Sequence, residues 1–201
     1  MTAVTGLLGY LIGSLPLGYL AARQWAGVDL RRVGSGNVGA TNVWRVSGPG
    51  LGALVMAVDV AKGAAAVVLA GRLTPLETDS VTAGVAAVAG HMFPVWLRGR
   101  GGKGVATACG AFALLAPLAT ACAAALFVLT TAATRLVSAA SIAASATLPL
   151  VAAALGGSRA VVTGSLVAAV LIVGRHGPNL RRLWRGTERR LGRRDGGDAR
   201  A

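Results

Sequence analysis

The feature that most constrains this chain is a series of long apolar segments. They run over residues 4–22, 51–71, 81–97, 105–134, 136–155 and 160–174. Hydrophobic residues make up 54% of the 201 and charged residues only 13%, and the mean hydropathy is +0.65, unlike a soluble domain. Several segments are long enough to cross a hydrocarbon core of about 30 Å. The sequence therefore predicts an all-α, polytopic membrane helix bundle.

The segment 105–134 decides how many times the chain crosses. As one helix, its 30 residues would extend about 45 Å, which is long for one crossing and short for two. Pro117 lies near its middle, so we expect two short spans and seven transmembrane helices in all. No positive segment precedes the first apolar run, which predicts an uncleaved span rather than a signal peptide.

The distribution of positive charge agrees with seven spans. With the N-terminus outside, 17 of the 20 basic residues fall in inner segments, as the positive-inside rule requires. This orientation puts the C-terminus in the cytoplasm. It also explains the net charge of +13 by topology and by attraction to anionic lipid headgroups, so we expect no nucleic-acid partner. Residues 1–188 are predicted to form the membrane domain, and the basic segment 189–201 a disordered cytoplasmic tail.

A glycine-rich stretch, GSGNVGATN at 34–42, superficially matches the dinucleotide-binding fingerprint, with Asp59 following at a suitable distance. The fingerprint requires a buried strand before it, but the preceding residues, VDLRRV, are charged. The turn residues 47–50 also end any helix too early for a crossover. The sequence therefore excludes a dinucleotide site here.

Metal and disulfide chemistry is not indicated either. Cys109 and Cys122 both lie in apolar runs, where cysteine usually packs as a small residue. The two histidines, His91 and His176, have no clustered carboxylates or CxxC motif beside them, so no metal site is expected.

Seven-span topology brings three polar segments, 31–45, 98–107 and 175–188, to the same side of the membrane. They are rich in Gly, Ser, Asn, Arg, Lys and His. Glycines allow backbone N–H groups to approach an anion, a helix that begins after them adds its positive end, and Lys and Arg supply charge. The combination favours phosphate binding. It is not a Walker A loop, because Leu97 stands where the motif requires its first glycine and Gly104 follows Lys103 where the motif requires Ser or Thr.

These segments resemble the three motifs of the bacterial acyl-phosphate:glycerol-3-phosphate acyltransferase family. The resemblance is carried by SGNVGATN with Arg45, by GHMFPVWL followed by GGKGVAT, and by HGPNLRRLWRGTE, while DVAKG at 59–63 resembles the second span of the family. It covers about residues 10–190. It implies a cofactor-independent enzyme of the bacterial inner membrane, with its active site on the cytoplasmic face. The implied reaction transfers a fatty acyl chain from acyl phosphate to the sn-1 hydroxyl of glycerol 3-phosphate, giving lysophosphatidate and phosphate, the first step of phospholipid synthesis.

Carried over residue by residue, the resemblance implies catalytic roles for Ser35, His176 and Asn179. It implies substrate-binding roles for a larger set: Gly36, Asn37, Thr41, Asn42, Arg45, Gly101, Gly102, Lys103 and Gly104. Our hypothesis is that Lys103 and the amides of the glycine loop bind one phosphate and Arg45 the other. Whether His176 acts as the base stays open, because the family is commonly described as giving the proton to a substrate phosphate.

Three residues are expected to be structural. Asp59 and Lys62 lie one helical turn apart at membrane depth, where charges need partners, so we expect an ion pair. Glu188 resembles the final acid of the third motif, which is more often structural. The implied partners are acyl phosphate, glycerol 3-phosphate, the bilayer and, as a further candidate, the peripheral enzyme that makes acyl phosphate.

Blander interpretations and other function classes remain open at this point. Ser35 and Asn179 could each cap a helix, and Lys103 could be a topology signal. His176 could be an interfacial residue, and His91 a packing or span-ending residue.

A transporter of a phosphorylated metabolite is the main alternative function, although its binding site would be expected at mid-membrane. Acyl-CoA-type acyltransferases carry H-x-x-x-x-D, but Trp96 and Arg181 stand where the aspartate would be needed. Arg98-Gly99-Arg100, Trp96 and Leu180 depart from the usual family pattern.

Overall fold

The computed structural model describes residues 1–192, which fold into helices joined by turns and loops, without a β-strand. The all-α prediction is confirmed for this part of the chain. The helices are α1 (Thr2–Ser14), α2 (Leu17–Ala26), α3 (Ala40–Ser47), α4 (Pro49–Leu73), α5 (Glu77–Met92), the 3₁₀ turn η1 (Val95–Leu97), α6 (Val105–Leu115), α7 (Pro117–Thr134), α8 (Val137–Ala154), α9 (Arg159–Arg175) and α10 (Gly177–Trp184).

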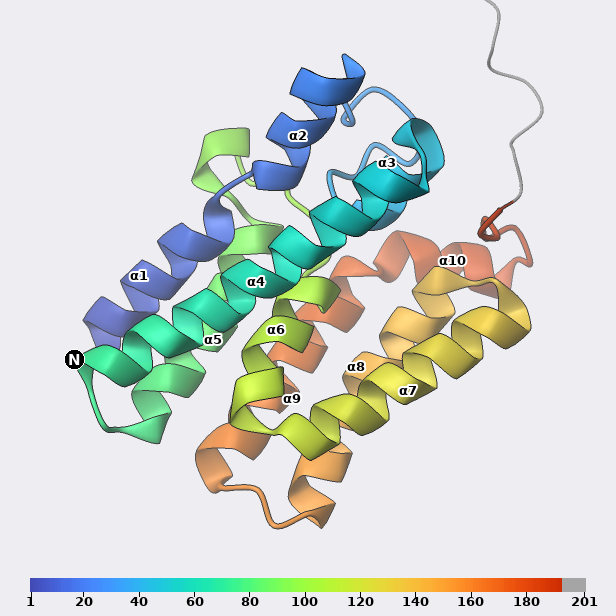
Figure 1. The fold of residues 1–201 in the computed structure, drawn as a ribbon. Helices are drawn as coiled ribbons and strands as arrows, with labels where there is room; N and C mark the ends of the chain where they lie inside the picture. Colours follow the sequence, from blue (N-terminus) through green and yellow to red (C-terminus); the bar gives the residue numbers. More distant parts are fainter. Residues whose placement is uncertain (193–201) are drawn as a thin grey trace, which may run out of the picture.

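The apolar run 105–134 is divided as expected. Its first part is α6, and Pro117 is the first residue of α7, the helical position that best tolerates a missing N–H. Ala116 between them is non-helical, with φ −148° and ψ 67°. Figure 1 shows the chain reversing direction at this point, so that α6 and α7 run in opposite directions.

The first apolar run is long and apolar enough to be the single span that the sequence predicts, over Thr2–Ala26, but its helix is broken within the span. Helix α1 ends at Ser14 and α2 begins at Leu17. Pro16 explains the break, because its ring disfavours a helical residue before it and removes one backbone donor.

Within residues 1–192, five segments are long and apolar enough to cross a membrane, or six if the bent pair α9 and α10 counts as one span. Helix α6, with 11 residues, is a shorter apolar helix. The count of seven spans and the orientation of the termini therefore stay predictions.

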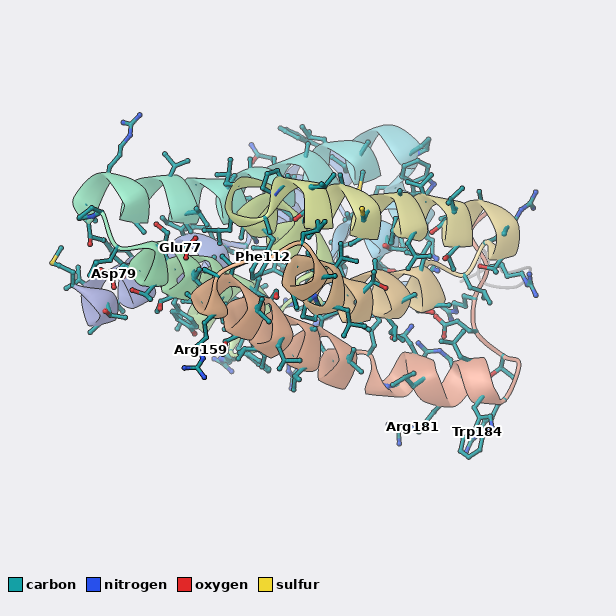
Figure 2. The ribbon with its side chains drawn as sticks, turned by 90° about the horizontal axis from the view of Figure 1, so that it is seen from below. Glu77, Asp79, Phe112, Arg159, Arg181 and Trp184 are labelled. Carbon is teal, nitrogen blue, oxygen red and sulfur yellow. The ribbon has the colours of Figure 1, made fainter. Side chains whose placement is uncertain are left out.

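Because successive helices reverse direction, the polar segments between them lie at defined ends of the bundle. In Figure 1, the loop before α3, the loop before α6 and helix α10 lie at one end of the bundle, and the N-terminus and the α8–α9 turn lie at the other. Figure 2 shows Glu77, Asp79 and Arg159 at the N-terminal end and Arg181 with Trp184 at the opposite end. The three segments that were predicted to share a side thus share one end of the fold.

The first residues of the predicted tail contact the bundle. The Leu191 N–H donates to the Arg135 carbonyl at 2.7 Å, and Arg190 donates to the Thr134 carbonyl at 2.8 Å. Residues 193–201 lie outside the described part of the chain, so the disordered tail stays a prediction.

Helices α1 and α5 approach each other closely through small residues. A Cβ atom on Gly9 would overlap the Ala83 carbonyl, and one on Gly13 would overlap the Ala87 carbonyl. Such contacts are typical of GxxxG helix pairs, whose backbones approach closely. The GxxxG spacing of Gly9 and Gly13 in the first apolar run predicts such a packing role, and the structure confirms it. A second contact region, around the fully buried Phe112 (Figure 2), joins α5, α6 and α9.

We expect Gly13→Ala to lower the free energy of unfolding by about 1–3 kcal/mol, because an added methyl group would push α1 away from the α5 backbone. Thermal unfolding of the purified protein in detergent measures this. Gly6→Ala is the matched control, since a Cβ there would lie 3.4 Å from the Thr82 methyl group, an ordinary contact. Equal unfolding temperatures for the two variants would contradict the close contact.

Candidate active site

The three polar segments meet around a cavity of about 440 Å³ that extends along the bundle between α6, α7, α8 and α9. Its polar lining comes largely from the shared end of the fold and includes Ser35, Asn37, Thr41, Asn42, Arg45, Lys103, His176, Asn179, Arg182 and Glu188. Its apolar lining comes from the helices and includes Ala108, Ala123, Phe127, Ala144, Leu148, Ala168 and Ile172. One cavity therefore combines a charged rim with an apolar interior.

The first segment is held in shape by Asn42. Its side-chain amide donates to the carbonyls of Leu30 (3.3 Å) and Val33 (3.1 Å), and its oxygen accepts from the Ser35 N–H at 2.8 Å. Gly34 has φ +60°, and a Cβ there would overlap the Asn42 oxygen. Asn42 was predicted to bind substrate, but these contacts occupy its amide within the loop. They leave Ser35 exposed beside the cavity.

The glycine loop differs from the prediction in its hydrogen bonding. The N–H groups of Gly101 and Gly102 donate to the carbonyls of Met92 (3.1 Å) and His91 (3.0 Å) at the end of α5. These two amides are therefore used inside the protein. Neither glycine lines the cavity, and neither does Gly36.

The first turn of α6 supplies the remaining backbone donors. Gly104 caps this helix with φ +82°, a conformation that favours glycine. Val105 and Ala106 come next in the chain and line the cavity. The first N–H groups of a helix have no partner within the helix and carry its positive end, so this turn suits an anion.

Lys103 joins the second segment to the third. Its Nζ donates to Asn179 Oδ1 at 2.6 Å. Burial lowers the pKa of Lys103 to about 8, against an opposing effect of Glu188, and the charges of Arg182, Arg45 and Arg175 lower it further. Lys103 thus lies close to three arginines, while Glu188 is the carboxylate that favours its charged form, an arrangement that favours a bound anion.

Glu188 organises the third segment. It accepts hydrogen bonds from Asn179 Nδ2 (2.6 Å), Ser138 Oγ (2.9 Å) and Arg182 Nε (2.7 Å). Burial opposes its ionisation, but these three donors hold the pKa of Glu188 below its usual value. The contacts are those of a structural residue that fixes α10 against α8.

His176 follows the last residue of α9, is 1% exposed and lines the cavity. Its Nδ1 lies 2.8 Å from the Ile172 carbonyl. Because a carbonyl oxygen can only accept, Nδ1 carries the proton and Nε2 is left as an acceptor. Burial and the charge of Lys103 lower the pKa of His176 to about 4, so the ring is neutral at pH 7.

A buried ionic cluster lies beneath the glycine loop. Lys62 Nζ is 2.9 Å from Asp59 Oδ1, the ion pair that the sequence predicted. The third member was not predicted from the sequence: His91 Nδ1 lies 3.4 Å from the same carboxylate oxygen. His91 lies in the last turn of α5, next to the final residue Met92, and the cluster ties that end of the helix to α4.

The serines of α8 were not predicted as site residues either. Ser138, Ser141 and Ser145 all line the cavity. Their spacing of three and four residues in an otherwise apolar run places them on one helix face, which is the signal that could have found them. Arg182 lay inside a recognised motif, but its contact with Glu188 depends on the fold.

Comparison with known proteins identifies the family to which this geometry belongs. A family profile described as glycerol-3-phosphate acyltransferase matches residues 3–186. The chain belongs to the glycerol-3-phosphate acyltransferase family. The glycerol-3-phosphate acyltransferase of Myxococcus xanthus is 49% identical over 198 residues, covering 95% of this chain and 100% of the relative. The enzyme of Synechococcus sp. strain CC9902 is 48% identical over 186 residues, covering 92% of each chain.

Solved structures of this acyltransferase family share the fold. PlsY, described as an integral membrane glycerol 3-phosphate acyltransferase, has been solved in a glycerol 3-phosphate form, with a TM-score of 0.90, 37% identity and coverage of 95% of this chain and 96% of that one. Its lysophosphatidic acid form gives a TM-score of 0.87 at 35% identity, covering 95% of each chain. The predicted integral membrane helix bundle is therefore confirmed, and this chain is a multi-pass membrane acyltransferase.

Glu188→Ala is expected to lower the free energy of unfolding by about 1–3 kcal/mol, because it leaves the Asn179 amide and the Arg182 guanidinium without their acceptor. Thermal unfolding in detergent measures the effect. The control is Asp29→Asn, which removes a carboxylate from an exposed ion pair with Arg31 and should change stability little. Glu188→Ala protein as stable as the control would contradict the structural role.

Proposed function

We propose that this acyltransferase uses acyl phosphate as its donor and acylates the sn-1 hydroxyl of glycerol 3-phosphate, releasing lysophosphatidate and phosphate. We further propose that the end of the bundle that carries the three polar segments faces the cytoplasm from the bacterial inner membrane. There it would receive acyl phosphate from the peripheral enzyme that makes it.

The observation that carries this proposal is the composition of the cavity. A charged rim that includes Arg45, Lys103 and Arg182 opens onto an interior lined by residues such as Phe127 and Leu148. Both proposed substrates carry a phosphate, and one also carries a long acyl chain. A single cavity with these two kinds of lining accommodates phosphate groups at the rim and the chain inside.

Position and charge would supply most of the catalysis. The carbonyl of an acyl phosphate is already activated, so no covalent nucleophile is required from the protein. Lys103 and the first-turn amides of α6 bind one phosphate, and Arg45 steadies the other. Aligning the glycerol hydroxyl on the carbonyl and stabilising the developing oxyanion with fixed donors then lowers the barrier. Ser35 and Asn179 orient the reacting groups.

The proton leaves the hydroxyl as its oxygen bonds to the carbonyl carbon and the bond from that carbon to the phosphate oxygen breaks. With a pKa of about 4, His176 is a weak base at neutral pH. Its role in this proposal is to accept a hydrogen bond at Nε2 from the second, non-reacting hydroxyl of glycerol 3-phosphate, which orients the substrate while the attacking hydroxyl faces a substrate phosphate. A substrate phosphate, whose second pKa is about 6, takes the proton.

The test is lysophosphatidate formation by detergent-purified protein that is offered glycerol 3-phosphate with either palmitoyl phosphate or palmitoyl-CoA. We expect turnover with palmitoyl phosphate only, and a loss of about 100-fold or more in Lys103→Ala, as for removal of an oriented charged donor. Arg100→Ala, an exposed arginine of the same loop, is the control and should retain activity.

Turnover with palmitoyl-CoA alone would contradict the proposed donor. Absence of turnover with both donors, in protein shown to be folded, would contradict the proposed reaction and favour a transporter of a phosphorylated metabolite. Full activity in Lys103→Ala would contradict the proposed phosphate site.

A further inference from the structure

The dipeptide Gly101-Gly102, which immediately precedes Lys103, is engaged on both sides of its backbone. Its two N–H groups donate to carbonyls at the end of α5. Its two carbonyls accept from one arginine: Arg175 Nε lies 3.4 Å from the Gly102 oxygen, and Arg175 Nη2 lies 3.4 Å from the Gly101 oxygen. All four backbone polar groups of the dipeptide therefore have protein partners.

Arg175 is itself held in place. It is the last residue of α9 and is half-buried. Its guanidinium lies over the ring of Phe93, 5.3 Å from the centroid, a cation–π arrangement. Phe93 caps the end of α5. The planar guanidinium thus bridges the ends of two helices while its N–H groups reach two adjacent carbonyls, which a single ammonium group does not reproduce.

The opposite side of the dipeptide is closed by His91. A Cβ on Gly102 would overlap the His91 ring, and a Cβ on Gly101 would overlap the His91 carbonyl oxygen. Asp59 in turn contacts the ring at 3.4 Å. The dipeptide is therefore enclosed between the buried ionic cluster and Arg175.

The enclosed dipeptide sets the position of Lys103, the next residue in the chain. Lys103 Nζ reaches Asn179 in α10, and α10 leaves α9 at an angle of 60° directly after Arg175 and His176. Residues at this bend thus contact the loop in two places. Arg175 binds the backbone just before Lys103, and Asn179 binds the side chain of Lys103. Moving Arg175 would shift Lys103 relative to His176.

We propose that Arg175 is a positioning residue that fixes the Gly101-Gly102 backbone and so holds Lys103 in register with His176 and Asn179. The inference rests on the proposed role of Lys103 in phosphate binding. Arg175 itself is outside the lining of the cavity, so it acts through Lys103 rather than on the substrate.

The first test compares Arg175→Lys with wild type. The lysine keeps the positive charge and loses the fork that reaches two carbonyls. We expect kcat/KM for glycerol 3-phosphate to fall about 10- to 100-fold, the range associated with small displacements of a catalytic group. Arg181→Lys is the matched control, since Arg181 is an exposed arginine of α10 (Figure 2), and it should retain wild-type kcat/KM.

A second readout requires no turnover. Acetylation of Lys103 by acetic anhydride, followed by mass spectrometry over a range of pH, reports the protonation and accessibility of its amine. Lys62, the only other lysine in the sequence, is the internal reference. The wild-type midpoint should lie near the pKa of about 8, which burial and the charges of Arg182, Arg45 and Arg175 lower and Glu188 raises.

Two variants, Arg175→Gln and Arg175→Lys, should distinguish the effect of the Arg175 charge on Lys103 from its effect on the position of Lys103. Arg175→Gln removes a neighbouring cation, so the pKa of Lys103 and the midpoint of labelling move to higher pH. Arg175→Lys keeps the neighbouring positive charge, so the midpoint rises only as far as the release of the loop reduces the burial of Lys103, and the limiting rate of labelling rises because the loop is released. If the wild type and both variants label as described but the wild type does not turn over, the proposed function fails while the positioning role of Arg175 is supported.

Wild-type kcat/KM together with wild-type labelling in Arg175→Lys would overturn the proposal. An equal loss of activity in Arg181→Lys would also overturn it, because the effect would then reflect arginine content rather than position. If Arg175→Lys fails to fold, Phe93→Leu provides the test instead. It removes the ring beneath the guanidinium and keeps the positive charge of Arg175. We expect a smaller loss of kcat/KM there, and wild-type behaviour in labelling and activity would overturn the proposal.

Discussion

The hydrogen bond from Lys103 to Asn179 joins two segments that are 76 residues apart in the sequence, and the rest of the site is arranged around it. Asn179 can present its oxygen to Lys103 because Glu188 accepts from its amide nitrogen. Glu188 is held by Ser138 and Arg182. The chain of contacts therefore runs from the residues before α6 through α10 to α8, and its members line the rim of the cavity.

The electrostatics of the rim follow from the same contacts. Arg45, Arg175 and Arg182 all disfavour the charged form of Lys103, and Glu188 alone favours it. Positive charge gathered in a partly dehydrated place is unfavourable without an anion. A bound phosphate would relieve this repulsion, so substrate binding and the stability of the rim are coupled. The same excess of positive charge agrees with an enzyme that handles two phosphorylated substrates.

The sequence was sufficient where local chemistry decides the structure. Pro117 marks the reversal between α6 and α7, Gly9 and Gly13 mark the close contact with α5, and the spacing of Asp59 and Lys62 gives their ion pair. Each of these depends on one residue type at one spacing. The convergence of the three polar segments was predicted by counting spans and charges.

Hydrogen-bond partners that depend on tertiary packing could not be predicted in this way. The amides of Gly101 and Gly102 look available to a phosphate in the sequence, but the end of α5 lies beside them and accepts from both. His91 joins Asp59 only because α4 and α5 pack together.

The central claim is that one cavity holds the phosphate groups at its rim and the acyl chain in its interior. Photocrosslinking tests it most directly, with a hydrolysis-resistant acyl phosphonate that carries a diazirine at the end of its chain. Adducts on interior residues such as Phe127, Leu148 or Ala168, suppressed by excess unlabelled acyl phosphonate, are the predicted result. Adducts confined to the outward-facing Val128, Leu129 and Val170 would place the chain in the surrounding lipid and contradict the account.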